Sequence, residues 1–216
     1  MQFNELDRCL LKTLARVKFA TPAQLAYWCN AHRTSIQRRL ARMESEDMVV
    51  AHTHQQPTIW ALKHSAAALM QTRLPAGGRR ASWSVMAHTC HKNAVEIQLG
   101  EEEGTRGFRF LDRAFFWKHG LNPAHGENGG VDQAKRAYLV LLDDYRMQPQ
   151  RIGHTWVREH KPPRQFFSGH RNVAWSEIVH QYLVVTTDSV RAEQHQSWIE
   201  RHTIPARVLT IRPLWD

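Results

Sequence analysis

The sequence predicts an α+β protein in two parts, a mainly helical N-terminal module and a C-terminal domain in which strands alternate with helices. Apolar side chains recur at helical spacing through residues 4–43, whereas residues 137–142 are a continuous apolar run of the length typical of a buried strand, and 182–187 predict a second one. A segment at 74–80 that combines proline, two glycines and two arginines separates the two patterns. With 42% hydrophobic residues and eight tryptophans among 216 residues, the chain can bury a core.

The N-terminal module begins with two predicted helices. Asn4 can cap a first helix that runs to about Val17 and carries apolar residues on one face. Thr21 and Pro22 open a second helix, because a hydroxyl caps helix starts and proline at the first helical position has no N–H to lose. This second helix is expected to end before Asn30.

A third, basic helix follows, for which Thr34 is the expected cap. Ile36, Leu40 and Met43 fall on one stripe of this helix, so we expect them to be buried. The segment 31–42 contains four arginines and no acidic residue, whereas acidic residues follow directly at 44–47. A merely solvated helix face does not explain this separation of charge.

Two extended segments after the basic helix predict a β-hairpin. Residues 47–50 begin the first strand, residues 52–57 form the turn, and residues 58–62 return as the second strand. A short helix, a tight turn, a basic helix and a hairpin, in this order, are typical of a winged helix-turn-helix, whose basic helix enters the major groove of DNA. We therefore expect the module to bind double-stranded DNA sequence-specifically; the alternative is an adaptor whose winged helix binds protein.

The expected DNA contacts fall into two groups. The N-terminal part of a recognition helix usually reaches base edges, where arginine favours guanine and glutamine favours adenine through paired hydrogen bonds. The residues expected there are His32, Arg33, Ser35, Gln37 and Arg38. The residues expected near phosphates are Arg39, Arg42, His52 and His54, although a solvated helix face would equally account for Arg39 and Arg42.

The distribution of charge supports a nucleic-acid partner. The formal net charge is +9, and residues 1–80 hold 12 basic and 5 acidic side chains against 17 and 15 in the rest of the chain. A basic excess on one module is what phosphate binding requires. We expect no membrane partner, because no apolar run has the length of a bilayer span. Three cysteines without paired spacing and a polar N-terminus predict a cytoplasmic protein.

The expected domain boundaries are a winged helix at 1–74, a linker at 75–82 and an α/β domain at 83–216. Residues 84–99 predict a helix, or a helix that runs into a strand, and the glycine-rich residues 122–130 predict a loop. The remaining expected elements are strands at 108–111, 137–142, 155–159, 182–187 and 206–211, and helices at 65–70, within 167–180 and at 192–201.

The chain resembles the replication-relaxation family of plasmid and integrative-element proteins. The resemblance rests on residues 6–62, on 88–99, and on the strands around Tyr138 and Trp156. It implies a C-terminal domain similar to the PD-(D/E)xK nuclease fold and a role in replication, in transfer as a relaxosome accessory, or in transcriptional control on a mobile element. A relaxase or replication protein is the implied partner, and the second domain could also provide homodimer contacts.

The C-terminal domain departs from the nuclease pattern in one of its two metal-binding strands. Glu159 and Lys161 fit the (D/E)xK spacing, and residues two apart share a strand face. Arg136 stands where the nuclease has an aspartate, and a cation repels a metal ion. Asp132 lies upstream, and Asp143–Asp144 end the strand. A metal-dependent nuclease or relaxase would use Glu159, Lys161 and Asp132; otherwise we expect a degenerate fold used for binding, without catalytic residues, metal or cofactor.

One further cluster, His88, Cys90 and His91, could suggest a metal. Zinc needs three or four ligands, and no second Cys/His pair with matching spacing lies nearby. We expect ordinary packing and hydrogen bonding at these residues.

Overall fold

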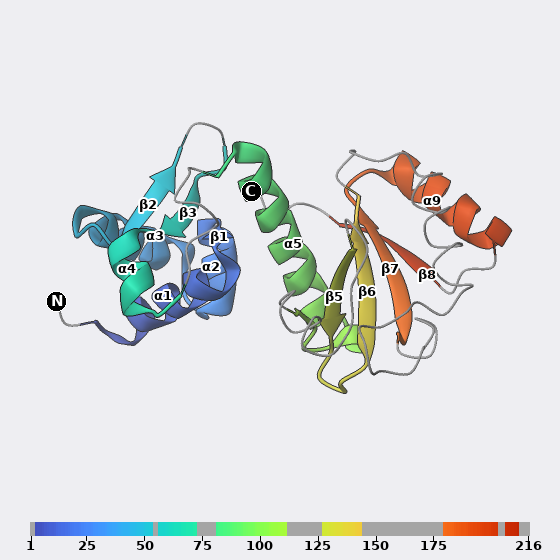
Figure 1. Ribbon diagram of the computed structural model, residues 1–216, viewed down its shortest axis with the longest axis horizontal. Coiled ribbons are helices and arrows are strands. Elements are labelled where there is room, and N and C mark those ends of the chain that lie inside the picture. Colours follow the sequence, from blue (N-terminus) through green and yellow to red (C-terminus); the bar gives the residue numbers. More distant parts are fainter. Residues whose placement is uncertain are drawn as a thin grey trace, which may run out of the picture. The chain divides into compact units, whose positions relative to one another are not determined.

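The computed structural model describes residues 3–53, 56–72, 81–111, 127–143, 179–202 and 206–211, and these contain both helices and sheets, as the α+β prediction requires. The chain divides into two compact units, of which the first extends to Ile97 and the second begins at Gln98 (Figure 1). The division lies inside helix α5 (Trp83–Glu101), and therefore later in the chain than the expected linker at 75–82.

The first unit consists of helices and a small antiparallel sheet. In chain order its elements are α1 (Glu5–Val17), β1 (Phe19–Ala20), α2 (Pro22–Trp28), α3 (Arg33–Ser45), β2 (Val49–His52), β3 (Ile59–Leu62), α4 (His64–Leu69) and the first part of α5. The strands lie in the order β1-β3-β2. The expected helix starts at Asn4 and Thr21 are confirmed, because each forms a capping box with the residue three positions on, Asp7 and Gln24 respectively. Strand β1 was not expected.

The predicted start of the third helix is wrong. Helix α3 begins at Arg33 with His32 at the capping position, and the His32 side chain makes no capping hydrogen bond. Thr34 lies inside the first turn with an exposed side chain. The apolar stripe is confirmed, since Ile36, Leu40 and Met43 are each 0% exposed.

Both faces of the small sheet are covered. Trp60 and Leu62 of β3 belong to a core with the apolar faces of α1, α2 and α3. Ile59 and Ala61 point to the other face, as alternation along a strand requires, and pack with Met86 and Cys90 of α5, among others. All four residues of β3 are therefore buried.

Hydrogen bonds between buried groups join α5 to this unit. The Gln24 side-chain amide donates to the Cys90 carbonyl at 2.7 Å, and the Asn93 side-chain amide donates to the Phe19 carbonyl at 2.7 Å. Gln24 and Asn93 are buried, so these contacts replace hydrogen bonds to water that the side chains lose on folding. Residues 83–97 thus form part of the first unit's core.

The second unit is built on a five-stranded mixed sheet in the order β4-β5-β6-β7-β8. Its strands are β4 (Arg109–Phe110), β5 (Glu127–Val131), β6 (Ala137–Leu142), β7 (Gln181–Thr186) and β8 (Ala206–Thr210), and its helices are the end of α5, η1 (Glu103–Thr105) and α9 (Ser189–His202). Strands β6, β7 and β8 are parallel, whereas β4 and β5 pair antiparallel. Helix α9 covers one face of the sheet, where Ile199 packs against Leu139 and Val184 (Figure 1).

The expected loop at 122–130 is wrong for its last residues, which belong to β5. Gly129 and Gly130 lie opposite Leu139 and Tyr138 of β6. A Cβ on Gly130 would lie 2.2 Å from the Phe108 ring, so glycine allows the aromatic ring to pack on the strand. Of the two alternatives for 84–99, the continuous helix is confirmed. The expected strand at 155–159 and most of the helix expected within 167–180 lie outside the described residues.

Candidate nucleic-acid interface

Helix α3 presents a polar face opposite its buried stripe. Outside the stripe, Arg33, Thr34, Gln37, Arg38 and Ala41 are exposed. Because Ile36, Leu40 and Met43 fix the helix against α1 and α2, the direction of the polar face is set by the core of the unit.

The four arginines of α3 differ in their partners. Within the described part of the chain, Arg33 and Arg38 form no ion pair. Arg42 Nε lies 3.1 Å from Glu46 Oε1, and Arg39 Nη1 lies 3.7 Å from the buried Asp7 carboxylate of α1. Arg33 and Arg38 therefore have the guanidinium groups most available to an external anion.

The acidic residues at the C-terminal end of α3 and directly after it are bound internally. Glu44 Oε1 accepts a hydrogen bond from the Ala51 backbone at 3.0 Å, and Asp47 Oδ1 lies 2.5 Å from Lys63 Nζ. Together with the Arg42–Glu46 pair, these contacts hold the negative charge at the C-terminal end of the helix. The N-terminal half of α3 carries only basic and neutral side chains, as its sequence indicated.

The other residues expected to contact DNA differ in their exposure to solvent. His32 is exposed at the start of α3 and Ser35 is half-buried. His52, at the end of β2, is half-buried with its ring edge-to-face with Phe19 at a centroid distance of 6.3 Å. His54 lies outside the described residues. The structure thus groups His32, Arg33, Gln37 and Arg38 as exposed residues of one helix end.

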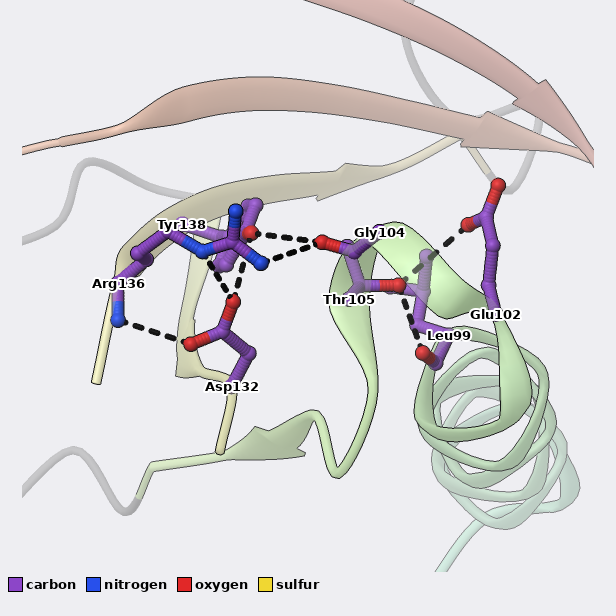
Figure 2. Close-up of polar contacts among 7 residues, drawn as sticks. All are labelled: Leu99, Glu102, Gly104, Thr105, Asp132, Arg136 and Tyr138. Atoms are coloured by element: carbon purple, nitrogen blue, oxygen red, sulfur yellow. Dashed lines mark hydrogen bonds and ion pairs between the residues drawn. The ribbon is translucent and has the colours of Figure 1, made fainter. Parts of the chain in front are cut away.

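Asp132, the candidate metal ligand, is held by its neighbours in the turn between β5 and β6 (Figure 2). Its Oδ1 accepts from the Arg136 backbone N–H at 2.9 Å, and its Oδ2 accepts from Arg136 Nε at 2.6 Å and from the Tyr138 hydroxyl at 3.0 Å. Arg136 Nη2 also donates to the Gly104 carbonyl at 2.6 Å, which attaches the turn to η1. A metal ion at Asp132 would have to compete with a guanidinium cation for the same carboxylate.

The ionisation of this cluster follows from its contacts. Burial alone would raise the pKa of Asp132, but the hydrogen bonds from Arg136 and Tyr138 and the Arg136 charge outweigh burial and lower it. Burial and the hydrogen bond to Asp132 raise the pKa of Tyr138 to about 12. The cluster is therefore a carboxylate bound by a guanidinium and a neutral phenol, an arrangement that stabilises the turn.

A second buried carboxylate, Asp143, lies at the carboxyl end of β6. Arg191 of α9 binds it through Nε and Nη2, each at 2.6 Å, and His195 Nε2 lies 2.8 Å from Asp143 Oδ2. The sequence hint was the i, i+4 spacing of Arg191 and His195, which places both on one face of a helix. This contact fixes α9 to the sheet. The carboxylate of Asp143, like that of Asp132, is bound by side chains of the protein itself.

Among the described residues, no three His, Cys, Asp or Glu side chains lie together in a way that could hold a metal ion. Cys90 and His91 are buried in α5, and burial raises the pKa of the Cys90 thiol to about 12. Glu159 and Lys161 lie outside the described residues.

A model of the replication-relaxation family matches residues 11–131, more than half of the 216-residue chain, and the chain belongs to this family. Membership suggests a role in the replication or relaxation of plasmids or mobile elements. Comparison with curated proteins and with solved structures gave no match. Over the described residues, no helix combines the length and the apolar character needed to cross a bilayer.

Proposed function

We propose that the first unit is a winged helix-turn-helix that binds double-stranded DNA sequence-specifically, with α3 in the major groove. The order helix, strand, helix, helix, strand, strand and the sheet order β1-β3-β2 support this proposal. The hairpin of β2 and β3 is then the wing, and α2, the turn at 29–32 and α3 are the helix-turn-helix.

The observation that carries the proposal is the state of Arg33 and Arg38. Both are exposed at the N-terminal half of α3, and neither has an acidic partner among the described residues, whereas Arg39 and Arg42 do. Gln37, in the same half of the helix, is also exposed. Arginine and glutamine side chains are suited to paired hydrogen bonds with guanine and adenine edges.

The remaining contacts are assigned by position. Arg33, Gln37 and Arg38 would read bases, with His32 and Ser35 at the edge of the same surface. Arg39, Arg42 and the wing histidines His52 and His54 would lie near phosphates. Phosphate contacts favour all sequences alike, so the discrimination between sites would depend on the first group.

The family supports a role in replication or relaxation on a plasmid or mobile element. Our proposal places the DNA binding in replication, transfer or transcriptional control on such an element, in the cytoplasm. In transfer the protein would act as a relaxosome accessory, with a relaxase or replication protein as its partner. The second unit would supply homodimer contacts, partner docking or further contacts to DNA.

The test is selection of DNA by the purified full chain from a random duplex pool, followed by sequencing and by fluorescence anisotropy on the selected and scrambled duplexes. We expect an enriched motif and a preference for it that Arg38→Ala reduces. Failure to enrich any motif, with equal binding of both duplexes, would contradict sequence-specific binding. Absence of binding even at low salt would favour the protein-binding adaptor instead.

A further inference from the structure

Two cysteines on different helices of the first unit lie close together. Cys9 is in the middle of α1, and Cys29 is the C-terminal cap of α2. Thr13 Oγ1 lies 4.0 Å from the sulfur of each, and Cys9 Sγ lies 3.9 Å from the Trp28 carbonyl oxygen, one residue before Cys29. The tertiary structure thus pairs two thiols that have no paired spacing in the sequence.

The Cys29 thiol is affected by its surroundings, Cys9 included. Burial raises the pKa of Cys29 to about 12, and a hydrogen bond and charge interaction with Cys9 add to this effect, while a hydrogen bond with Thr13 opposes it. Each sulfur atom lies 4.0 Å from the same Thr13 hydroxyl oxygen, so the two thiols share one polar neighbour. Both side chains are only half-buried, so a small reagent in solvent can approach them.

We propose that Cys9 and Cys29 form a redox-active dithiol that a low-molecular-weight disulfide, such as glutathione disulfide, converts to an internal Cys9–Cys29 bridge. Cys90 does not take part, because it is 0% exposed in the core between α5 and the small sheet.

The exchange proceeds in two steps. Cys9, after losing its proton to solvent, attacks one sulfur of the glutathione disulfide, which forms a mixed disulfide at Cys9 and releases one glutathione thiolate. Cys29 then loses its proton and attacks the Cys9 sulfur of the mixed disulfide, which forms the bridge and releases the second glutathione thiolate. The two protein thiols are oxidised, and one glutathione disulfide is reduced to two molecules of glutathione.

Cys29 suits the second step better than the first. A thiol with a raised pKa is rarely ionised in solution, so Cys29 reacts slowly with external reagents. Once the mixed disulfide has formed at Cys9, however, attack by the Cys29 thiol is intramolecular and has a high effective concentration.

The bridge would tie α1 to the end of α2. It closes a loop that contains β1 and α2, and this lowers the conformational entropy of the unfolded chain. It also fixes the residue from which the turn at 29–32 leads into α3. Oxidation is therefore expected to stabilise the first unit.

The test is peptide mapping of the full chain by mass spectrometry without reductant, after treatment with a glutathione redox buffer. We expect a crosslinked pair of peptides that contain Cys9 and Cys29, and its loss on reduction. Cys90→Ser is the matched control and should still form the bridge, whereas Cys29→Ser should accumulate glutathione at Cys9. The oxidised wild-type chain should also unfold at a midpoint about 5–10 °C higher than the reduced chain.

Glutathione adducts or links between chains, without the internal Cys9–Cys29 peptide pair, would overturn the proposal. A crosslink through Cys90 would also overturn it. The mapping is done on the unaltered chain and therefore gives an answer even if a variant fails to fold. It does not depend on DNA binding, so a failure here and a failure of the proposed function are distinguishable.

Discussion

The side-chain amide of Asn93 donates a hydrogen bond to the backbone carbonyl of Phe19 at 2.7 Å, and both residues are buried. Asn93 belongs to α5 and Phe19 to β1, so this bond joins the long helix to the edge of the small sheet. The basic helix α3 is oriented by a unit whose core extends to Ile97, and a segment ending at residue 74 would leave one face of that sheet without its cover.

The Asn93 bond predicts a loss of stability on truncation of the side chain. Asn93→Ala removes the donor from a buried carbonyl, which should lower the free energy of unfolding by about 1–3 kcal/mol in urea titrations. Gln98→Ala, at an exposed position of the same helix, is the control and should change it by less than about 0.5 kcal/mol. Equal effects of the two substitutions would mean that α5 does not depend on this contact.

The apolar stripe of α3 predicts a larger effect at Leu40. Its side chain is 0% exposed, so Leu40→Ala should leave a cavity and lower the free energy of unfolding by roughly 2–5 kcal/mol. The neighbouring Ala41 is exposed, and Ala41→Ser should lower the free energy of unfolding by only about a few tenths of a kcal/mol. A small loss at Leu40 in thermal or urea unfolding would contradict the burial of the stripe.

On the proposed DNA site, the arginines of α3 should separate into two classes. Arg33→Ala or Arg38→Ala should cost about 1–3 kcal/mol on the selected duplex and relax the preference at one base position. Arg42→Ala should weaken all duplexes alike and make the dependence on salt shallower. Anisotropy titrations at several salt concentrations measure both effects. Full affinity in Arg33→Ala and Arg38→Ala proteins would show that α3 does not read the bases.

The Asp132 cluster predicts a pH dependence. The contacts of Asp132 lower its pKa in the folded state below the ordinary aspartate value of 3.8, so its stabilising contribution is fully present above that value. The contribution is lost as the pH falls further, through the folded-state pKa. Asp132→Asn should therefore destabilise the second unit at neutral pH, and the difference from wild type should shrink below about pH 4 in acid unfolding experiments. A difference independent of pH would exclude the carboxylate charge as its cause.

The chain is expected not to cut DNA. In the nuclease pattern that the resemblance implies, Arg136 would take the place of a metal-binding aspartate, and Asp132 is already bound by Arg136 and Tyr138. Supercoiled and linear plasmid should stay intact with the purified chain in magnesium or manganese. Nicking that disappears in a Glu159→Ala variant would make a nuclease the better description, since that residue completes the (D/E)xK pattern.

Local patterns in the sequence were sufficient to predict the elements that depend on interactions between neighbouring residues. The Asn4 and Thr21 caps, the Ile36, Leu40 and Met43 stripe, and the apolar strands β6 and β7 all depend on side chains within one or two turns or on one continuous run. The basic half of α3 was visible for the same reason, because charge along one helix is a property of neighbouring residues.

Other features needed the tertiary structure. Strand β5 was missed because its glycines indicate a loop, and only the packing of the Phe108 ring shows why a strand has Gly130 there. The extension of the first unit into α5 depends on hydrogen bonds between residues far apart in the chain, such as Gln24 and Cys90.

The same distinction applies to the candidate sites. The sequence by itself determined which arginines lie on α3, but only the folded chain assigned Arg39 to Asp7 and left Arg33 and Arg38 without acidic partners among the described residues. Folding also brings Cys9 close to the end of α2, where Cys29 lies, and gives both carboxylate oxygens of Asp132 internal hydrogen bonds. The physical reason is that charge and helical periodicity are local properties of the sequence. The partner of a charged side chain or a thiol, in contrast, depends on residues that only folding brings into contact.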